Sequence, residues 1–244
     1  MKALTHTTEC YSKYVVSCLD DKSAYDCGHC ANCLGREFVP SVVSQGALEK
    51  AAEYVDGLII PILPRKMWTG SAVTGPKKIK YINQEGFCLS KYGDAGYGEL
   101  VKQGKYSRGK RFREELVGKS AELLRPFIRA HGITSLSCVP SLRSDIVKNF
   151  AERLAVSLGL PFMELLIKTS ARQQKEMENG AHQCENAYQS FSAKEDADFP
   201  KAVLLVDDIV DSRWTLTVCG YRIMEAGCAE VYPFALADSS QREE

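Results

Sequence analysis

Four cysteines near the N-terminus constrain the folding of this chain more than any other feature. Cys10 is followed, after sixteen residues, by the tight run CGHCANC, which places Cys27, Cys30 and Cys33 in one turn. Such a turn supplies three thiolates to a tetrahedral zinc ion, and Cys10 supplies the fourth. The intervening segment YSKYVVSCL is expected to be a helix. The region has few large apolar residues, so zinc binding would provide much of its folding free energy.

Other uses of these thiols stay open. His29 could replace one ligand, although it lies between two cysteines, and four free thiols or an iron–sulfur cluster are further alternatives. Disulfides are not expected, because MKALTHTTEC lacks the apolar core of a signal peptide and the expected cytoplasmic location keeps thiols reduced. No 18-residue apolar run predicts a membrane span. Six further cysteines are expected to be ordinary small, mostly buried side chains: Cys18, Cys88, Cys138, Cys184, Cys219 and Cys228.

The cysteine spacing resembles the zinc-binding subdomain of RecQ-type DNA helicases, in which C-x-x-C-D-x-C stands where this chain has CGHCANC. The resemblance covers residues 6–36 and implies DNA and a helicase core as partners. The helicase motor is not expected here. The nearest approach to a phosphate loop is GSAVTGPKK at residues 70–78, where Pro76 stands in place of the required lysine. We therefore expect a surface loop there, and an accessory region of an ATP-dependent DNA helicase.

The C-terminal half alternates helix-like and strand-like segments. Of the 244 residues, 45% are apolar and 25% charged, which is enough to form a core. Helices are expected at residues 108–132, 144–160 (with Ser144 as N-cap) and 214–227, and strands at 133–140, 161–167, 201–210 and 228–237. This order predicts an α/β fold with a parallel sheet flanked by helices. Residues 168–198 are polar and irregular, and thirty such residues between strands are uncommon unless functional or disordered.

The stretch VLLVDDIVDSRWTL, residues 203–216, is the strongest candidate site in this half. A buried strand delivers Asp207 and Asp208 at its carboxyl end, where ligands bind in such sheets. Adjacent carboxylates suit the 2- and 3-hydroxyls of a ribose. The N-terminus of the following helix suits a phosphate, and Ser212 and Thr215 add hydroxyl donors. The alternative is a helix start with solvated aspartates.

This stretch resembles the phosphoribosylpyrophosphate motif of type I phosphoribosyltransferases. The resemblance implies that Asp207 and Asp208 hold the ribose hydroxyls and that a following loop wraps the 5-phosphate. That loop comprises Asp211, Ser212, Arg213, Trp214 and Thr215. Catalysis in the family rests on positioning and on Mg²⁺ bound with phosphoribosylpyrophosphate. Arg213 stands where the family usually has glycine, so it could reshape the loop or add a charged donor to the phosphate, and Trp214 is expected to pack beneath it.

The resemblance extends over residues 115–240 and is closest to the ComFC-like subgroup. Residues 139–155 resemble its pyrophosphate loop and helix, which implies roles for Ser141, Leu142 and Arg143. The segment 168–191 resembles its mobile loop, which implies roles for Lys168, Gln174 and Asn186, the last in an N-x4-F spacing.

The middle of the chain predicts a connector between two domains. The sequence predicts a zinc-binding module at residues 1–36, a mixed connector at 37–110 and a phosphoribosyltransferase-like domain at 111–244. Within the connector we expect a helix at 45–56 and a strand in GLIIPILPRKMW. Lys and Arg equal Asp and Glu at 31 each, so a basic surface must be local. Two basic clusters are candidate DNA contacts or solvated surface: Arg65, Lys66, Trp68, Lys77, Lys78 and Lys80; and Lys102, Lys105, Arg108, Lys110, Arg111 and Arg113.

Three hypotheses follow. The chain is the C-terminal region of a RecQ-type helicase, active in DNA repair or recombination, whose added domain binds a phosphorylated ribose or nucleotide. Alternatively it is a stand-alone phosphoribosyltransferase with a structural zinc finger. The third reading is a ComFC-like module that binds its ligand without turnover, which Arg213 in place of glycine favours.

Overall fold

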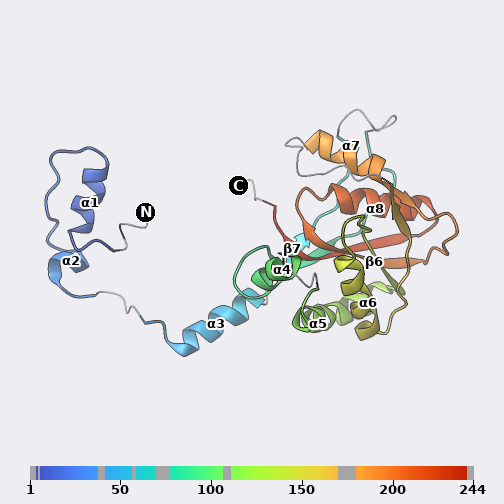
Figure 1. Ribbon diagram of the computed structural model, residues 1–244, viewed down its shortest axis with the longest axis horizontal. Coiled ribbons are helices and arrows are strands. Elements are labelled where there is room, and N and C mark those ends of the chain that lie inside the picture. Colours follow the sequence, from blue (N-terminus) through green and yellow to red (C-terminus); the bar gives the residue numbers. More distant parts are fainter. Residues whose placement is uncertain are drawn as a thin grey trace. The chain divides into compact units, whose positions relative to one another are not determined.

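The computed structural model of the chain describes residues 4, 6–37, 42–56, 59–69, 77–106, 111–169 and 180–240. The chain forms two compact units, Met1–Glu53 and Tyr54–Glu244. The four clustered cysteines belong to the first unit, and the sheet belongs to the second (Figure 1). No described helix combines the length and the apolarity that a membrane span requires.

The first unit is built from short helices and has almost no apolar core. Helix α1 (Tyr11–Cys18) confirms the helix expected between the cysteines, and α2 (Ala31–Leu34) begins directly after Cys30. Helix α3 (Gln45–Asp56) confirms the helix expected at residues 45–56. Among the described residues up to Lys50, Cys10 is the one buried side chain. Side-chain burial alone therefore provides little folding free energy here.

The second unit contains a five-stranded, mostly parallel sheet with the order β1-β2-β7-β6-β3. Its strands are β1 (Ile60–Ile62), β2 (Gly86–Lys91), β3 (Ser135–Cys138), β6 (Ala202–Val210) and β7 (Glu230–Asp238). Only β1 is antiparallel to its neighbour. The expected α/β fold with a parallel sheet flanked by helices is confirmed.

Helices cover both faces of this sheet (Figure 1). Alternate residues of β6 enter two separate cores, with Leu204 and Val206 in one and Val203 and Leu205 in the other. Helices α5 (Glu114–His131) and α6 (Ile146–Leu158) cover the first core, as expected from their apolar periodicity. Helices α7 (Gly180–Ser190) and α8 (Trp214–Glu225) cover the second. Burial on both faces explains the uninterrupted apolar run of β6.

The strand expected at residues 161–167 does not join the main sheet. It touches β3 through a single bridge between Leu136 and Phe162, and Pro161 has no N–H with which to extend that pairing. The chain then forms β4 (Leu166–Lys168), which pairs antiparallel with β5 (Phe191–Ala193) in a separate two-stranded sheet. Part of the polar segment 168–198 is therefore regular, in α7 and β5.

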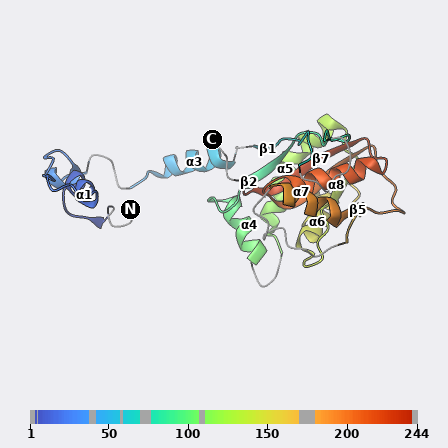
Figure 2. The same cartoon turned by 90° about the horizontal axis from the view of Figure 1, so that it is seen from above.

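The connector expected at residues 37–110 is largely part of the second unit. Strands β1 and β2 complete the main sheet, because β2 pairs in parallel with β7 at Phe87 and Phe234. Helix α4 (Tyr97–Tyr106) lies beside β2 (Figure 2) and packs Val101 into the first core. The sequence did not predict that β2 and α4 belong to this unit. Both lie before residues 111–244, where the regular alternation of strand-like and helix-like segments is recognisable.

Candidate ligand and metal sites

The cysteine cluster of the first unit brings four sulfur atoms together. The Sγ atoms of Cys10, Cys27, Cys30 and Cys33 all lie within 4.8 Å of one another. Thiolates at the corners of a zinc tetrahedron, with Zn–S bonds of about 2.3 Å, lie about 3.8 Å apart. The donor set and its spacing therefore fit a structural zinc ion.

Backbone N–H groups donate to the sulfur atoms of this cluster. The N–H of Cys27 donates to Sγ of Cys10 at 3.2 Å, and the N–H of Cys33 donates to Sγ of Cys30 at 3.4 Å. The N–H of His29 is the largest cause that lowers the pKa of the Cys27 thiol, to about 6. The His29 ring instead lies with Nδ1 2.6 Å from the carbonyl oxygen of Cys27. This arrangement favours four cysteines over a histidine ligand.

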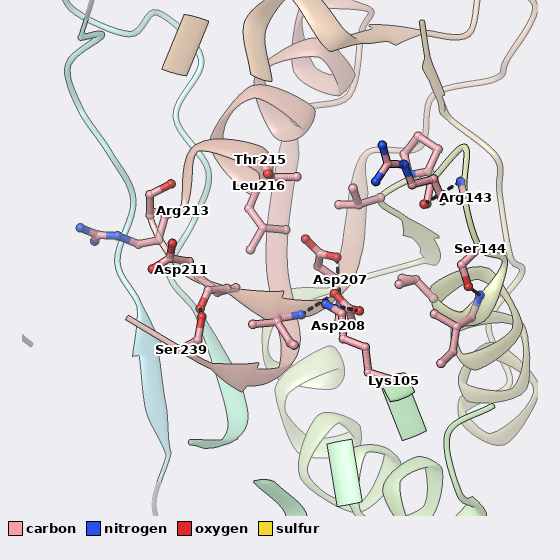
Figure 3. Close-up of a pocket in the computed structure, with 18 of the residues that line it drawn as sticks. Lys105, Arg143, Ser144, Asp207, Asp208, Asp211, Arg213, Thr215, Leu216 and Ser239 are labelled. Atoms are coloured by element: carbon pink, nitrogen blue, oxygen red, sulfur yellow. Dashed lines mark hydrogen bonds and ion pairs between the residues drawn. The ribbon is translucent and has the colours of Figure 1, made fainter. Parts of the chain in front are cut away.

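In the second unit, a cavity of about 770 Å³ opens where the parallel strands end. Its wall includes residues that follow β2, β3, β6 and β7, which is the edge where ligands bind in sheets of this kind. Asp207 and Asp208 lie between Arg143 and Ser144 on one side and residues 211–215 on the other (Figure 3). The two carboxylates and the start of α8 therefore share one cavity.

The two aspartates have different environments. Asp207 is 9% exposed, and its Oδ1 accepts the N–H of Asp208 at 2.8 Å. Burial, and then repulsion by Asp208, raise the pKa of Asp207 to about 8. Asp208 is paired with a cation, because its Oδ2 lies 3.1 Å from Nζ of Lys105. Of the two carboxyls, the buried Asp207 therefore holds its proton to higher pH than an ordinary aspartate, while Asp208 forms the ion pair with Lys105.

The raised pKa of Asp207 predicts a pH-dependent stability. The folded pKa of about 8 lies above the reference value of 3.8, so its contribution is complete below pH 4 and is lost as pH rises through 8. Asp207→Asn mimics the protonated form. Relative to wild type, this variant should gain a few kcal/mol of unfolding free energy between pH 4 and pH 9.

Urea unfolding of both proteins across this pH range measures the difference. Asp196→Asn is the control, because Asp196 is exposed in the second unit. A wild-type minus Asp207→Asn difference that stays constant with pH would contradict a protonated Asp207.

The loop between β6 and α8 contains a backbone conformation that is typical of glycine, although no glycine is present there. Arg213 has φ 68°, in the left-handed region that glycine prefers, and no side chain caps α8. The Arg213 guanidinium points away from Asp207 and Asp208 (Figure 3), and its Nη1 donates to the carbonyl oxygen of Leu63 at 3.0 Å. Arg213 thus reshapes the loop's contacts and does not plug the cavity. Trp214 is 1% exposed and packs into the second core beneath the loop, outside the cavity wall, so the phosphate role expected for its side chain needs correction.

The remaining expected ligand residues are only partly brought together. Ser141, Arg143 and Lys168 line the cavity. Leu142 is 57% exposed and is not part of the wall. Asn186 is buried in α7, where its Oδ1 accepts a hydrogen bond from Ser190. Gln174 lies outside the described residues, as do Arg108, Lys110 and residues 70–76 of GSAVTGPKK.

Several residues of the cavity wall belong to no motif in the sequence. Helix α4 and the end of β2 contribute Tyr92, Lys105 and Tyr106, while α7 and the end of β7 contribute Gln183 and Ser239. Lys105 had been assigned to a basic cluster, and no local pattern relates it to Asp208, which lies a hundred residues away. Only the pairing of β2 with β7 brings these segments to the same sheet edge.

The expectation for Arg65, Lys66 and Trp68 needs correction. Trp68 is 7% exposed and lies in the second core, so its ring is not available to stack on DNA. Arg65 is engaged with the loop before α8. Only Lys66 of the three is exposed. The cluster in the sequence therefore does not form one exposed basic surface, because Arg65 and Trp68 face the second unit's interior and Lys66 faces solvent.

Comparisons with known proteins are limited to the fold. No protein-family model matches the chain, and no curated protein matches it. Among solved structures, adenine phosphoribosyltransferase from Leishmania tarentolae aligns with 15% identity and a TM-score of 0.35, over 52% of this chain and 72% of that one. Another adenine phosphoribosyltransferase aligns with 14% identity and a TM-score of 0.34, over 52% and 81%. The allosteric regulatory enzyme of purine biosynthesis aligns with 23% identity and a TM-score of 0.30, over 47% of this chain and 24% of that one.

Proposed function

We propose that the second unit binds a ribose 5-phosphate group, either in phosphoribosylpyrophosphate or in a nucleotide. The observation that carries this proposal is the shared cavity, into which both aspartates and the N-terminus of α8 open. Its volume lies within the range of about 300–1,000 Å³ that small ligands occupy. In this proposal Asp207 and Asp208 face the ribose hydroxyls, and Asp211, Ser212, Thr215 and the backbone of Arg213 surround the phosphate.

The cavity wall offers cationic partners to an anionic ligand beside its three aspartates. Lys105, Arg143 and Lys168 line it from α4, the segment after β3 and β4. Lys105 also pairs with Asp208, so Arg143 and Lys168 are the cations we assign to phosphate groups. Mg²⁺ bound with phosphoribosylpyrophosphate would supply further charge neutralisation in a transfer reaction.

Calorimetry with the full chain tests ligand binding. Ribose 5-phosphate and phosphoribosylpyrophosphate, each with and without Mg²⁺, should bind, and unphosphorylated ribose should bind at least tenfold more weakly. Equal affinity for ribose and ribose 5-phosphate would contradict the phosphate assignment. Pyrophosphate release with a panel of nucleobases then separates a phosphoribosyltransferase from a ComFC-like module that binds without turnover.

For the first unit we propose a structural zinc ion and a DNA-binding role beside a RecQ-type helicase core. The four-cysteine geometry supports the zinc ion, and the cysteine spacing supports the RecQ relationship. Fluorescence anisotropy with duplex DNA, before and after zinc chelation, tests this role. Chelation should weaken binding, and a chain that binds no DNA in either state would contradict it.

A further inference from the structure

The segment that follows β1 and the loop before α8 exchange hydrogen bonds in both directions. Arg65 donates from Nε and Nη2 to the carbonyl oxygen of Ser212, at 2.8 and 2.7 Å. In return, Arg213 donates from Nη1 to the carbonyl oxygen of Leu63 at 3.0 Å. Because two donors of one guanidinium meet a single oxygen, the Ser212 carbonyl is held in one direction.

The same segment also holds the first residue of α8. The Cζ atom of Arg65 lies 4.2 Å from the centre of the Trp214 ring, and the Trp68 ring stacks on Trp214 at 6.2 Å and 17°. Trp68 and Trp214 are 7% and 1% exposed. The two tryptophan rings are therefore buried. The segment after β1 contacts the loop at the Ser212 carbonyl and at the Trp214 side chain.

This loop needs support from outside. Arg213 holds a left-handed conformation that is unfavourable for any residue except glycine, and α8 has no side-chain cap. Strained conformations persist where surrounding contacts determine them. Among the described residues, Arg65 provides the hydrogen bonds made to the peptide group between Ser212 and Arg213.

The direction of the Ser212 carbonyl decides where the next N–H points. In a trans peptide the C=O of one residue and the N–H of the next point in opposite directions. Arg65 is not part of the cavity wall, whereas Ser212 and Arg213 are. Because the Ser212 carbonyl oxygen accepts both Arg65 donors, the N–H of Arg213 points away from Arg65.

We propose that Arg65 is a positioning residue that orients the backbone N–H groups of residues 212–215 toward the 5-phosphate of the ligand. This inference rests on the proposed function. In this proposal Arg65 holds the phosphate loop in place. The loop needs this support because Arg213 stands where a glycine would adopt the same conformation easily.

Arg65→Met tests this proposal, because it keeps an unbranched apolar stem over Trp214 and removes both hydrogen bonds to Ser212. Lys66→Met is the matched control: it removes one positive charge from the next, exposed residue. We expect Arg65→Met to weaken ribose 5-phosphate binding about tenfold in calorimetry, Lys66→Met to change it less than twofold, and ribose binding to stay unchanged in both. Arg65→Lys, which keeps the charge without the two-donor geometry, should give an intermediate loss and serves if Arg65→Met folds poorly.

Amide hydrogen exchange in the ligand-free chain separates this proposal from the proposed function. Exchange of the Thr217 amide, which donates to the carbonyl oxygen of Arg213 at 2.9 Å, should be about tenfold faster in Arg65→Met than in Lys66→Met. Equal exchange in the two variants overturns the positioning role, whatever the ligand is. Equal loss of affinity in the two variants also overturns it, because charge alone would then explain the effect. A third outcome is possible, in which exchange is faster in Arg65→Met but the wild-type chain binds no ribose 5-phosphate. That result overturns the assigned ligand and the proposed function, and it still shows that Arg65 supports the loop.

Discussion

Cys27→Ser is expected to abolish zinc binding and to unfold the first unit. The four sulfur atoms form one cluster, and this unit lacks an apolar core that could replace the metal. Structural zinc contributes roughly 10–16 kcal/mol to small zinc-binding peptides, which far exceeds what the short helices α1 and α2 could provide. Zinc content per chain should fall from one to zero, and helical circular dichroism should decrease. The thermal transition of the second unit should stay where it is.

Two further variants complete this test. Cys18→Ser is the control, since Cys18 is an exposed cysteine at the end of α1 and lies outside the cluster. It should keep one zinc ion. His29→Ala should keep it as well if the four ligands are cysteines. Zinc loss in either of these variants, or zinc retained in Cys27→Ser, would contradict the assigned ligand set.

Asp208→Asn should lower the affinity for ribose 5-phosphate by about 10- to 100-fold. Hydrogen bonds to a charged acceptor contribute about 1.5–3 kcal/mol, and an amide keeps the shape of the side chain while removing the charge. The Asp208 side chain is 14% exposed, so the bonds to ribose would form away from bulk water. Calorimetry against wild type gives the affinity ratio.

Inorganic phosphate distinguishes hydroxyl recognition from general electrostatics in this experiment. Removing a negative charge leaves Lys105 without its partner, so phosphate alone should bind Asp208→Asn equally well or more tightly. Asp196→Asn should leave the affinities for both ligands unchanged. A parallel loss of phosphate and ribose 5-phosphate affinity would show that Asp208 does not contact the sugar.

Several elements could be predicted because their cause lies within a few residues. The run VLLV predicts a strand buried on both faces, and β6 follows it through Asp207 and Asp208 to Val210. The apolar spacing and Gly132 predict α5, which ends with Gly132 in the left-handed conformation. The cysteine spacing predicts a cluster that the structure brings together. In each case hydrophobic period, turn chemistry or ligand spacing is a local property of the chain.

Other features could not be predicted, because they arise between segments far apart in the sequence. The stretch GFCLSK, which forms β2, is too short for its sequence to predict which strand it pairs with. Only its pairing with β7 places α4 and Lys105 at the candidate site. Ser144 was expected to cap α6. Its Oγ does accept the N–H of Ile146 at 3.3 Å, but Asp145 occupies the cap position, a shift of one residue that local spacing does not resolve.

By itself, the sequence determined the four-cysteine cluster, the α/β alternation of the C-terminal half and the adjacent aspartates near a strand end. The tertiary structure alone decided that β1 and β2 complete the sheet, that Lys105 pairs with Asp208 and that Arg65 holds the Ser212 carbonyl. The physical reason is the range of the forces. Backbone preference and apolar period act along neighbouring residues, whereas a charge or a guanidinium finds its partner only after packing has brought distant segments together.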